Sequence, residues 1–253
     1  MPRLIVTRPA AQAASWVRQL ATRGVEAIAL PLIEIAATPD PEPVHAAWAS
    51  LAARRLVVFV SANAVLHFFA ARPAGAIWPV PVLAAAPGPG TADALRGEGV
   101  AAAAIVEPAP DAPQFDSEAL WQRLAGRDWQ GASVLIVRGD GGRDWLAERL
   151  GEAGAKVDAV AAYARLAPKV SAEQRRSADA AFADPEGHVW LFSSSEAIAN
   201  LEALAGAPWP KRSRAIATHP RIAARARQAG FASVSEVGPG LDAVVACIQS
   251  MRP

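Results

Sequence analysis

Hydroxyl side chains follow two apolar stretches of the chain, at the points where helices are expected to begin. Ser61 follows LVVFV (56–60), with Asn63 just beyond it, and Ser194 lies in the serine run after HVWLF (188–192). The carboxyl edge of an open parallel sheet is where ligands bind, and backbone N–H groups at a helix start attract carboxylates. A simple N-cap role explains both serines equally well. Both interpretations stay open at this point.

A third helix start is expected after the turn Gly88-Pro89-Gly90. We expect Gly90 and Thr91 to open this helix, so that its N–H groups and the Thr91 hydroxyl could receive a carboxylate. Plain turn chemistry is the more frequent reason for such a sequence. His219 occupies the corresponding helix start later in the chain.

Two arginines lie in turns that follow strands. Arg138 opens RGDGGR (138–143), and Arg8 lies in the equivalent turn after the first strand. A guanidinium offers a planar fork of donors that matches a carboxylate. However, the 25 basic residues include only three lysines, so a single arginine is weak evidence for a ligand contact. Surface positions are the alternative for both.

Tyr163 is the only tyrosine in the chain, and it lies in a Pro-containing stretch, 162–171, that we interpret as a linker. A tyrosine phenol is protonated at neutral pH, so it can donate a proton to a leaving oxygen. On its residue type alone, a half-buried aromatic that packs the linker is the favoured interpretation.

The elements that must position these residues are short β-branched runs that alternate with helical patterns. The four clearest runs are LIVT (4–7), LVVFV (56–60), VLIV (134–137) and HVWLF (188–192). This alternation predicts βα units and a mainly parallel sheet, that is, an α/β fold.

The two halves of the chain resemble each other. Residues 56–65 parallel 189–198, and 87–100 parallel 218–231, each pair being a matching strand–helix or turn–helix segment. A repeat longer than 100 residues predicts two similar domains, whereas solenoid repeats are shorter. Linkers are expected at 30–43 and 162–171. We therefore predict one discontinuous domain, 1–35 plus 167–253, and a second domain, 36–165.

The composition excludes several classes of protein. The 25 basic and 24 acidic residues leave a net charge of +1, so no broad electrostatic surface for nucleic acid or membrane is expected. The hydrophobic share of 52% argues against disorder. Cys247 is the only cysteine, which excludes an intramolecular disulfide and suits a reducing cytoplasm. Neither a signal peptide nor a P-loop, hydrolase or zinc-protease motif is found, and no metal site is expected.

An ordered set of short motifs spans nearly the whole chain. The set comprises VTRP (6–9), LPLIEI (30–35), VFVSANAV (58–65), GPGTA (88–92), LIVRGDGGR (135–143), AY (162–163), FSSSEAI (192–198) and ATHPRIA (217–223). Together these motifs resemble the uroporphyrinogen-III synthase family.

The resemblance implies two flavodoxin-like domains with parallel sheets, joined by a two-stranded antiparallel linker. It also implies a cofactor-free hydro-lyase of tetrapyrrole (haem) biosynthesis that is cytoplasmic and monomeric. Its substrate would be hydroxymethylbilane, a linear tetrapyrrole with eight carboxylates. The enzyme cyclises it to uroporphyrinogen III with loss of water and inversion of the terminal pyrrole ring. Whether the bilane-forming enzyme hands over its product by transient contact stays open.

The resemblance also assigns roles to residues. Tyr163 matches the tyrosine that assists departure of the hydroxyl, and Thr91 matches the threonine of the GPGTA turn. Many relatives have a GPTTA-like turn where this chain has HPRIA (219–223), which leaves Thr218, His219 or Arg221 as substitutes. The expected substrate-binding residues are Arg8, Ser61, Asn63, Thr91, Arg138, Ser194, Thr218 and His219.

Two other functions fit the same elements. A non-enzymatic bilobed protein that closes on a small anion would also use two α/β domains. A two-lobed glycosyltransferase would need a longer chain. We expect a uroporphyrinogen-III synthase rather than either alternative.

Overall fold

The computed structural model describes residues 1–206 and 212–251, and the chain divides into two compact units. Unit 1 comprises Met1–Glu34 with Leu166–Pro253, and unit 2 comprises Ile35–Arg165. Each unit contains its own sheet and its own hydrophobic core.

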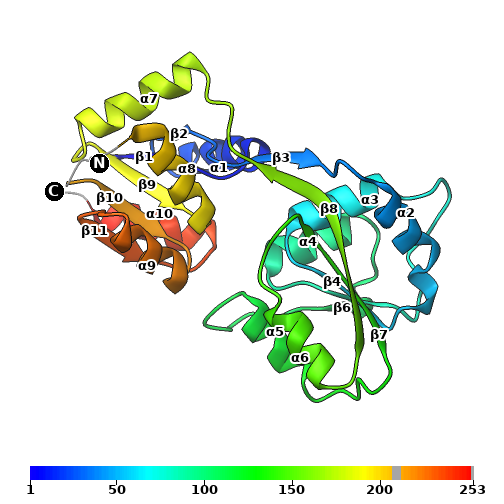
Figure 1. The fold of residues 1–253 in the computed structure, drawn as a ribbon. Coiled ribbons are helices and arrows are strands. Elements are labelled where there is room, and N and C mark those ends of the chain that lie inside the picture. The colour runs from blue at the N-terminus through cyan, green and yellow to red at the C-terminus, as the bar shows by residue number, and fades with distance from the viewer. Residues whose placement is uncertain (207–211, 252–253) are drawn as a thin grey trace. The chain divides into compact units, whose positions relative to one another are not determined.

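Unit 1 is built on a five-stranded parallel sheet (Figure 1). The strand order is β11-β10-β9-β1-β2. The strands are β1 (Arg3–Val6), β2 (Ala27–Ala29), β9 (His188–Phe192), β10 (Arg214–Ala217) and β11 (Ser233–Glu236). The helices are α1 (Ala10–Ala21), α7 (Ala172–Ala183), α8 (Ser195–Ala205), α9 (Pro220–Gln228) and α10 (Leu241–Ser250).

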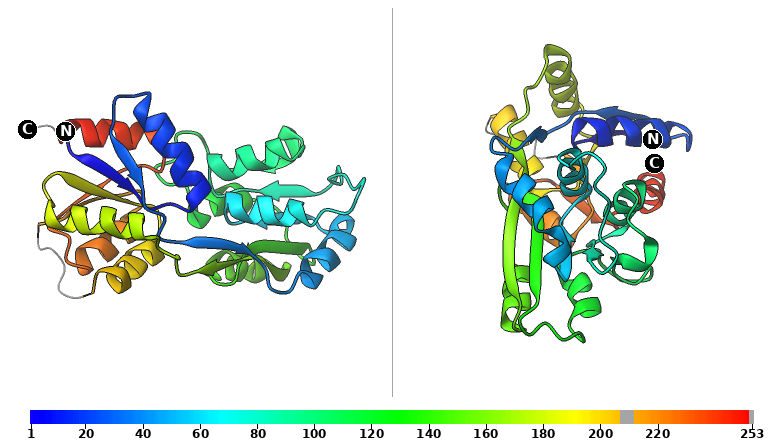
Figure 2. Two further views of the ribbon diagram at one scale, coloured as in Figure 1. Left: turned by 90° about the horizontal axis from the view of Figure 1, so that it is seen from above. Right: turned by 90° about the vertical axis from the view of Figure 1, so that its right-hand side faces the viewer.

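The side chains of β1 alternate between the two faces of this sheet, as in any β-strand. Helices cover both faces of the sheet (Figure 2). Leu4 and Val6 pack with Val244 and Ile248 of α10. On β9, Trp190 stacks against the aromatic ring of Phe182 in α7. Because both faces are buried, the strands read as nearly continuous apolar runs, which is the pattern expected of a parallel sheet.

Unit 2 is built on a six-stranded sheet in the order β3-β8-β7-β4-β5-β6. The strands are β3 (Glu34–Ala37), β4 (Leu56–Phe59), β5 (Leu83–Ala85), β6 (Ile105–Val106), β7 (Ser133–Gly139) and β8 (Lys156–Leu166). The helices are α2 (Glu42–Ala49), α3 (Ala62–Ala70), α4 (Pro89–Gly97), α5 (Ser117–Leu124) and α6 (Trp145–Glu152). Strands β4 to β8 are parallel, and β3 adds the antiparallel pair at the edge beside β8.

The two faces of this second sheet also carry separate cores. Val57 and Phe59 pack with α2, α3 and α4, and an aromatic cluster around Trp48, Phe68 and Phe69 fills this side. On the opposite face, β4 and β7 pack against α5 and α6 together with the buried Trp129. A sheet covered on both faces leaves only its edges and strand ends open to a ligand.

The strand order of each sheet contains one reversal of direction. In unit 1 the order matches the flavodoxin-like 2-1-3-4-5 pattern, and the reversal falls between β1 and β9. Unit 2 has the same order after circular permutation, and its reversal falls between β7 and β4. The predicted fold class, two flavodoxin-like α/β parts with parallel sheets, is therefore confirmed. Ligands of such sheets bind outside the carboxyl ends of the strands at the reversal.

One detail differs from the sequence-based predictions: the helix expected to open at Gly90 and Thr91 begins at Pro89, with Gly88 as its N-cap. The predicted two-stranded antiparallel pair is present as β3 beside β8, and the stretch 162–166, interpreted as linker, is the end of β8. Among the described residues, no helix is long and apolar enough to cross a membrane.

Candidate functional site

In unit 2, the reversal of strand order brings the carboxyl ends of β4 and β7 together. Ser61 lies just beyond the end of β4 and caps α3, because its Oγ accepts the N–H of Ala64 at 3.2 Å. Gly139 ends β7. Ser61 is partly exposed at this edge of the sheet.

Tyr163 reaches the same place through a β-bulge in β8. The register pairs Arg138 with Ala161 but Gly139 with Tyr163, so that Ala162 is an extra residue. In a regular strand Ala162 and Tyr163 would face opposite sides of the sheet. The bulge lets both side chains join the core on the α3 side. It therefore turns Tyr163 toward the start of α3.

The Tyr163 side chain is enclosed, with only 1% of its surface exposed. Its Oη lies 3.1 Å from Ser61 Oγ and accepts a long hydrogen bond, 3.5 Å, from Nη2 of Arg165. The imidazole of His67 stacks on the ring at a centroid distance of 5.7 Å. The interpretation of Tyr163 as a half-buried linker aromatic is therefore wrong: it is a buried strand residue whose hydroxyl meets the cap of α3.

Gly139 fits the edge of the Tyr163 ring because it has no side chain. A Cβ at this position would lie 2.9 Å from Cε2 and 3.0 Å from Cζ of Tyr163. Beyond Gly139, the backbone N–H of Asp140 donates to the carbonyl of Tyr163 at 3.1 Å. The Asp140 carboxylate in turn accepts the N–H of Arg165 at 3.0 Å. The end of β7 thus fixes the position of Tyr163.

His67 contributes a neutral ring to this arrangement. Partial burial lowers the pKa of His67 below its ordinary value, so the imidazole is uncharged at neutral pH. An uncharged ring stacks on the tyrosine without adding a charge near its hydroxyl. His67 was not among the residues expected at the site, and its stacking on Tyr163 makes it part of the site.

The remaining predicted residues of unit 2 have more ordinary surroundings. Asn63 is the second residue of α3 and is partly buried. Thr91 is the third residue of α4 and is 7% exposed, which limits direct access to its side chain. Arg138 pairs with Asp144. That pairing engages one nitrogen of the guanidinium which was expected to meet a substrate carboxylate.

In unit 1, the carboxyl ends of β1, β9 and β10 carry a row of polar residues. Ser194 caps α8 by accepting the N–H of Glu196 at 3.2 Å, and His219 caps α9 through Nδ1, which accepts the N–H of Arg221 at 3.1 Å. The Thr218 backbone N–H donates to Phe192 at 3.1 Å, and its side chain is 6% exposed. Ser194 and His219 therefore both have the N-cap role that the sequence allowed.

Arg8 lies at the strand-order reversal of unit 1, directly after β1. Its guanidinium lies 4.1 Å from the ring centroid of Trp16 and donates to Gln12 Oε1 at 3.4 Å. Within the described part of the chain, its Nε has no hydrogen-bond partner and no carboxylate pairs with it. Burial lowers the pKa of Arg8 to about 10. An incompletely paired, partly buried cation at a ligand-binding edge is typical of an anion-binding residue.

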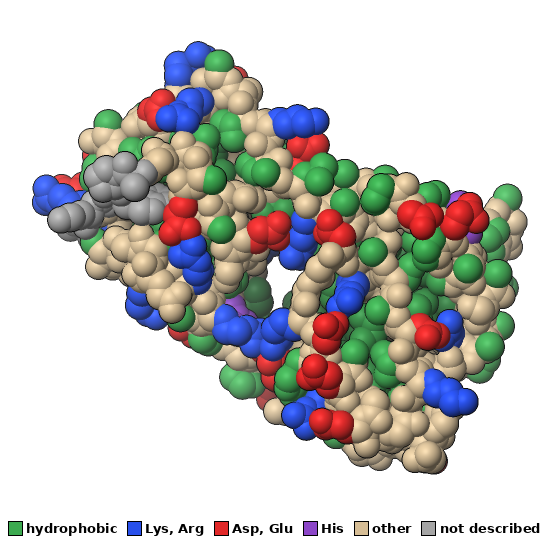
Figure 3. All heavy atoms as spheres, viewed as in Figure 1, with side chains coloured by type: hydrophobic (Ala, Val, Ile, Leu, Met, Phe, Trp, Pro, Cys, Tyr) green, Lys and Arg blue, Asp and Glu red, His purple; other side chains and the backbone are tan. Residues whose placement is uncertain are grey.

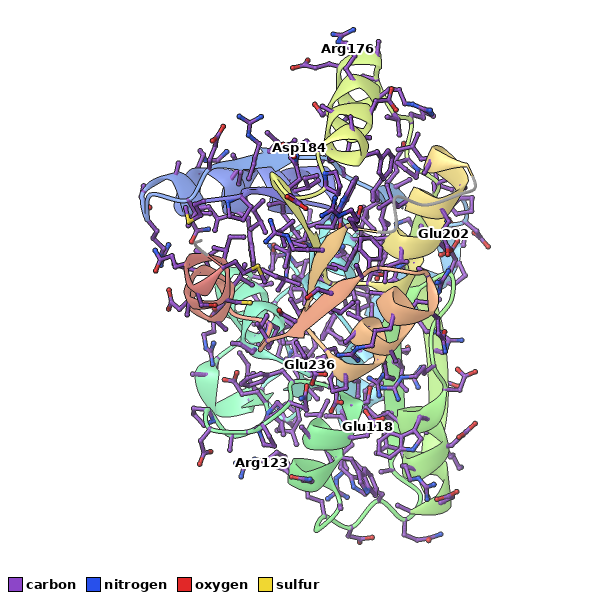
Figure 4. All side chains as sticks on the ribbon, turned by 90° about the vertical axis from the view of Figure 1, so that its left-hand side faces the viewer. Glu118, Arg123, Arg176, Asp184, Glu202 and Glu236 are labelled. Atoms are coloured by element: carbon purple, nitrogen blue, oxygen red, sulfur yellow. The ribbon has the colours of Figure 1, made fainter. Side chains whose placement is uncertain are left out.

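Most other arginines are engaged with acidic partners. Arg143 makes a bidentate contact with Glu118, and this hydrogen bonding raises the pKa of Arg143. Arg225 of α9 pairs with Glu202 of α8, which is labelled in Figure 4. Basic and acidic side chains are interspersed on the face shown in Figure 3. This pattern sets Arg8 apart from the paired surface arginines.

Sequence reasoning missed four contributors to the two edges, namely Thr7, His67, Gly139 and Arg165. Thr7 is buried at the end of β1 and donates to the carbonyl of Leu191 at 2.6 Å. Arg165 lies two residues after Tyr163, a spacing that points both side chains the same way in a strand. That spacing is the one signal in the sequence that could have identified Arg165.

Comparisons with known proteins agree on one family. The family model described as Uroporphyrinogen-III synthase HemD matches residues 14–246. A mutant uroporphyrinogen III synthase from the extremely thermophilic bacterium Thermus thermophilus is similar with a TM-score of 0.62 at 18% identity, covering 99% of this chain and 98% of that one. Uroporphyrinogen-III synthetase from Helicobacter pylori gives a TM-score of 0.61 at 15% identity, covering 100% of both chains. At these identities the solved structures show the shared fold.

Proposed function

Because the chain belongs to the uroporphyrinogen-III synthase family, we propose that it converts hydroxymethylbilane into uroporphyrinogen III, with loss of water and inversion of the terminal pyrrole ring. The observation that carries this proposal is the hydrogen-bonded pair of hydroxyls from Tyr163 and Ser61 at the strand-order reversal of unit 2. This pair can deliver a proton to a leaving hydroxyl where a sheet of this order binds its ligand.

The reaction needs little covalent help from the protein. The bilane loses its hydroxyl as water to give a resonance-stabilised azafulvenium cation. The substituted carbon of the terminal pyrrole attacks it, and the resulting spiro intermediate fragments and recloses in the opposite sense. Without the enzyme, the same cation closes to isomer I. The protein must therefore protonate the leaving group and hold one conformation of the chain.

Binding eight carboxylates requires many hydrogen-bond donors at the site rather than a high net positive charge of the whole protein. The capped starts of α3, α8 and α9 present backbone N–H groups at the carboxyl edges of their sheets. Arg8 supplies a guanidinium that no carboxylate of the described chain neutralises. We assign the substrate carboxylates to these groups, with Asn63 beside them. Thr91 and Thr218, at 7% and 6% exposed, offer little side-chain surface for direct contact. Arg138 is expected to contribute less to substrate binding, because its guanidinium is paired with Asp144.

We propose a cofactor-free hydro-lyase that works as a cytoplasmic monomer, with the two units behaving as separate domains. A transient contact with the enzyme that makes the bilane would limit spontaneous closure to isomer I.

The proposed function predicts the isomer composition of the product. We expect chelator-treated protein, given freshly prepared hydroxymethylbilane, to yield mostly isomer III, whereas buffer alone yields isomer I. The product is oxidised to the porphyrin and the isomers are separated by chromatography. A mixture identical to the buffer control would contradict the proposed function, and loss of activity after chelation would contradict only the absence of a metal.

Substitution of Arg8 by methionine is predicted to stabilise the protein while weakening substrate binding. Removing a partly buried, incompletely paired charge should raise the free energy of unfolding by about 1–2 kcal/mol at pH 7. Because folding lowers the pKa of Arg8 to about 10, the cost to wild-type stability is fully present below that pH and fades above it. Loss of a carboxylate contact should raise KM about tenfold.

Arg18→Met is the matched control for this prediction, since Arg18 lies on the exposed side of α1. It removes the same charge from the same region of the chain. We expect its KM to stay within a factor of two of wild type and its free energy of unfolding to stay within about 0.5 kcal/mol. Chemical denaturation and initial-rate kinetics on both variants give the comparison. An Arg8→Met protein that is less stable, with an unchanged KM, would remove Arg8 from the binding site.

A further inference from the structure

The hydroxyl proton of Tyr163 has one acceptor within the described residues. Its Oη has two polar neighbours there, Ser61 Oγ at 3.1 Å and Arg165 Nη2 at 3.5 Å. A guanidinium only donates hydrogen bonds, so it occupies an acceptor position on Oη. The Tyr163 proton is therefore directed to Ser61 Oγ.

Ser61 has both of its acceptor positions filled by this arrangement. One lone pair receives the N–H of Ala64 at 3.2 Å and the other receives the hydroxyl of Tyr163. A hydroxyl has two lone pairs and one proton, so the Ser61 proton must be donated to a third partner. Ser61 is partly exposed, while Tyr163 is 1% exposed. A ligand at this edge meets Ser61 first.

We propose that Ser61 is the catalytic residue that protonates the departing hydroxyl, and that Tyr163 reloads it through their shared hydrogen bond. This inference rests on the proposed function and deepens it, because it places the tyrosine behind a serine relay. Arg165 and His67 are positioning residues: Arg165 fixes the direction of the Tyr163 proton, and His67 holds the ring by stacking.

The proton balance of the step closes without a further reactant. The C–O bond of the hydroxymethyl group breaks, its electron pair leaves with the oxygen, and the oxygen takes the Ser61 proton to form water. Ser61 takes the proton of Tyr163, and the phenolate is held beside the Arg165 guanidinium. Ring closure later releases one proton from the pyrrole carbon that forms the new bond. That proton returns through Ser61 to Tyr163, so the enzyme is regenerated.

The relay is tested by substitutions at Ser61 that separate capping from proton transfer. Asparagine caps helices as well as serine does, but its amide does not pass a proton on, whereas threonine retains the hydroxyl. We expect kcat to fall at least tenfold in Ser61→Asn and in Ser61→Ala, and to recover to within threefold of wild type in Ser61→Thr. Ser171→Ala removes a comparable serine cap from α7, outside the site, and controls for the loss of a cap.

Solvent isotope effects provide a readout that a structural role would not move. In single-turnover experiments, transfer of two protons in wild type predicts a curved dependence of rate on the deuterium fraction of the solvent. Ser61→Ala should react more slowly, and its rate should depend linearly on the deuterium fraction. A kcat for Ser61→Asn and Ser61→Ala within twofold of Ser171→Ala would overturn the relay. That result, with wild type still producing isomer III, would leave the proposed function standing.

Discussion

Tyr163→Phe is expected to lower kcat about 100-fold while leaving KM within a factor of two of wild type. The substitution removes the only proton that the buried ring can deliver, yet it keeps the ring packed against His67 and Gly139. Losing the hydrogen bonds of its hydroxyl should cost about 1 kcal/mol of stability. Initial rates of isomer III formation and chemical denaturation measure both effects.

The split between kcat and KM distinguishes chemistry from binding in this variant. A group that acts only in the transition state changes turnover and leaves ground-state binding intact. An unchanged kcat would remove Tyr163 from the mechanism. A large rise in KM would instead make its hydroxyl a substrate-binding group.

Gly139→Ala is expected to have a comparably large effect without touching any hydroxyl. The new Cβ would lie 2.9 Å from the Tyr163 ring, closer than packed carbon atoms approach. The ring is held on its other sides by His67 and Ser61, so either β7 or the ring must shift. Such a shift breaks the 3.1 Å contact between Tyr163 Oη and Ser61 Oγ. We expect kcat to fall by at least tenfold and stability to fall by about 1–3 kcal/mol.

Gly141→Ala is the matched control, because Gly141 lies two residues after Gly139, in the loop that follows β7, with nothing within 4 Å of its added Cβ. Its kcat and stability should stay close to wild type. The double variant Gly139→Ala with Tyr163→Phe should have the kcat of Tyr163→Phe alone, since misplacing a ring without a hydroxyl has no further effect on proton transfer. Additive losses would show that Gly139 acts independently of Tyr163.

The parallel sheets were predictable because their strands are buried on both faces. LVVFV and HVWLF have few polar residues to interrupt them, and β4 and β9 form at these places. The serine at the end of each run was equally visible, and Ser61 and Ser194 cap the helices that follow. A local pattern was enough here because strand, cap and helix start depend on neighbouring residues.

The surroundings of Tyr163 were not predictable, because they depend on residues far apart in the chain. The bulge at Ala162 changes which face Tyr163 occupies, and the regular alternation of a strand gives no sign of it. The pairing with Ser61 joins residues 102 positions apart. The role of Gly139 as a space for the ring follows only from the register of β7 against β8.

For charged residues too, as Arg8 and Arg138 show, the contacts in the fold could not be predicted from the sequence. Both follow strands in similar turns, so their sequence contexts gave them equal weight. In the structure Asp144 pairs with Arg138, whereas Arg8 lies over Trp16 without a carboxylate among the described residues. A single arginine is informative only when its partners are known.

The share of isomer III in the product, measured against enzyme concentration, tests the central claim most directly. Enzymatic closure competes with spontaneous closure to isomer I, so the share should rise with wild-type concentration until isomer III dominates. Tyr163→Phe should reach the same plateau only at about 100-fold higher concentration, in line with its lower turnover. A share of isomer III that does not change with wild-type concentration would contradict the account.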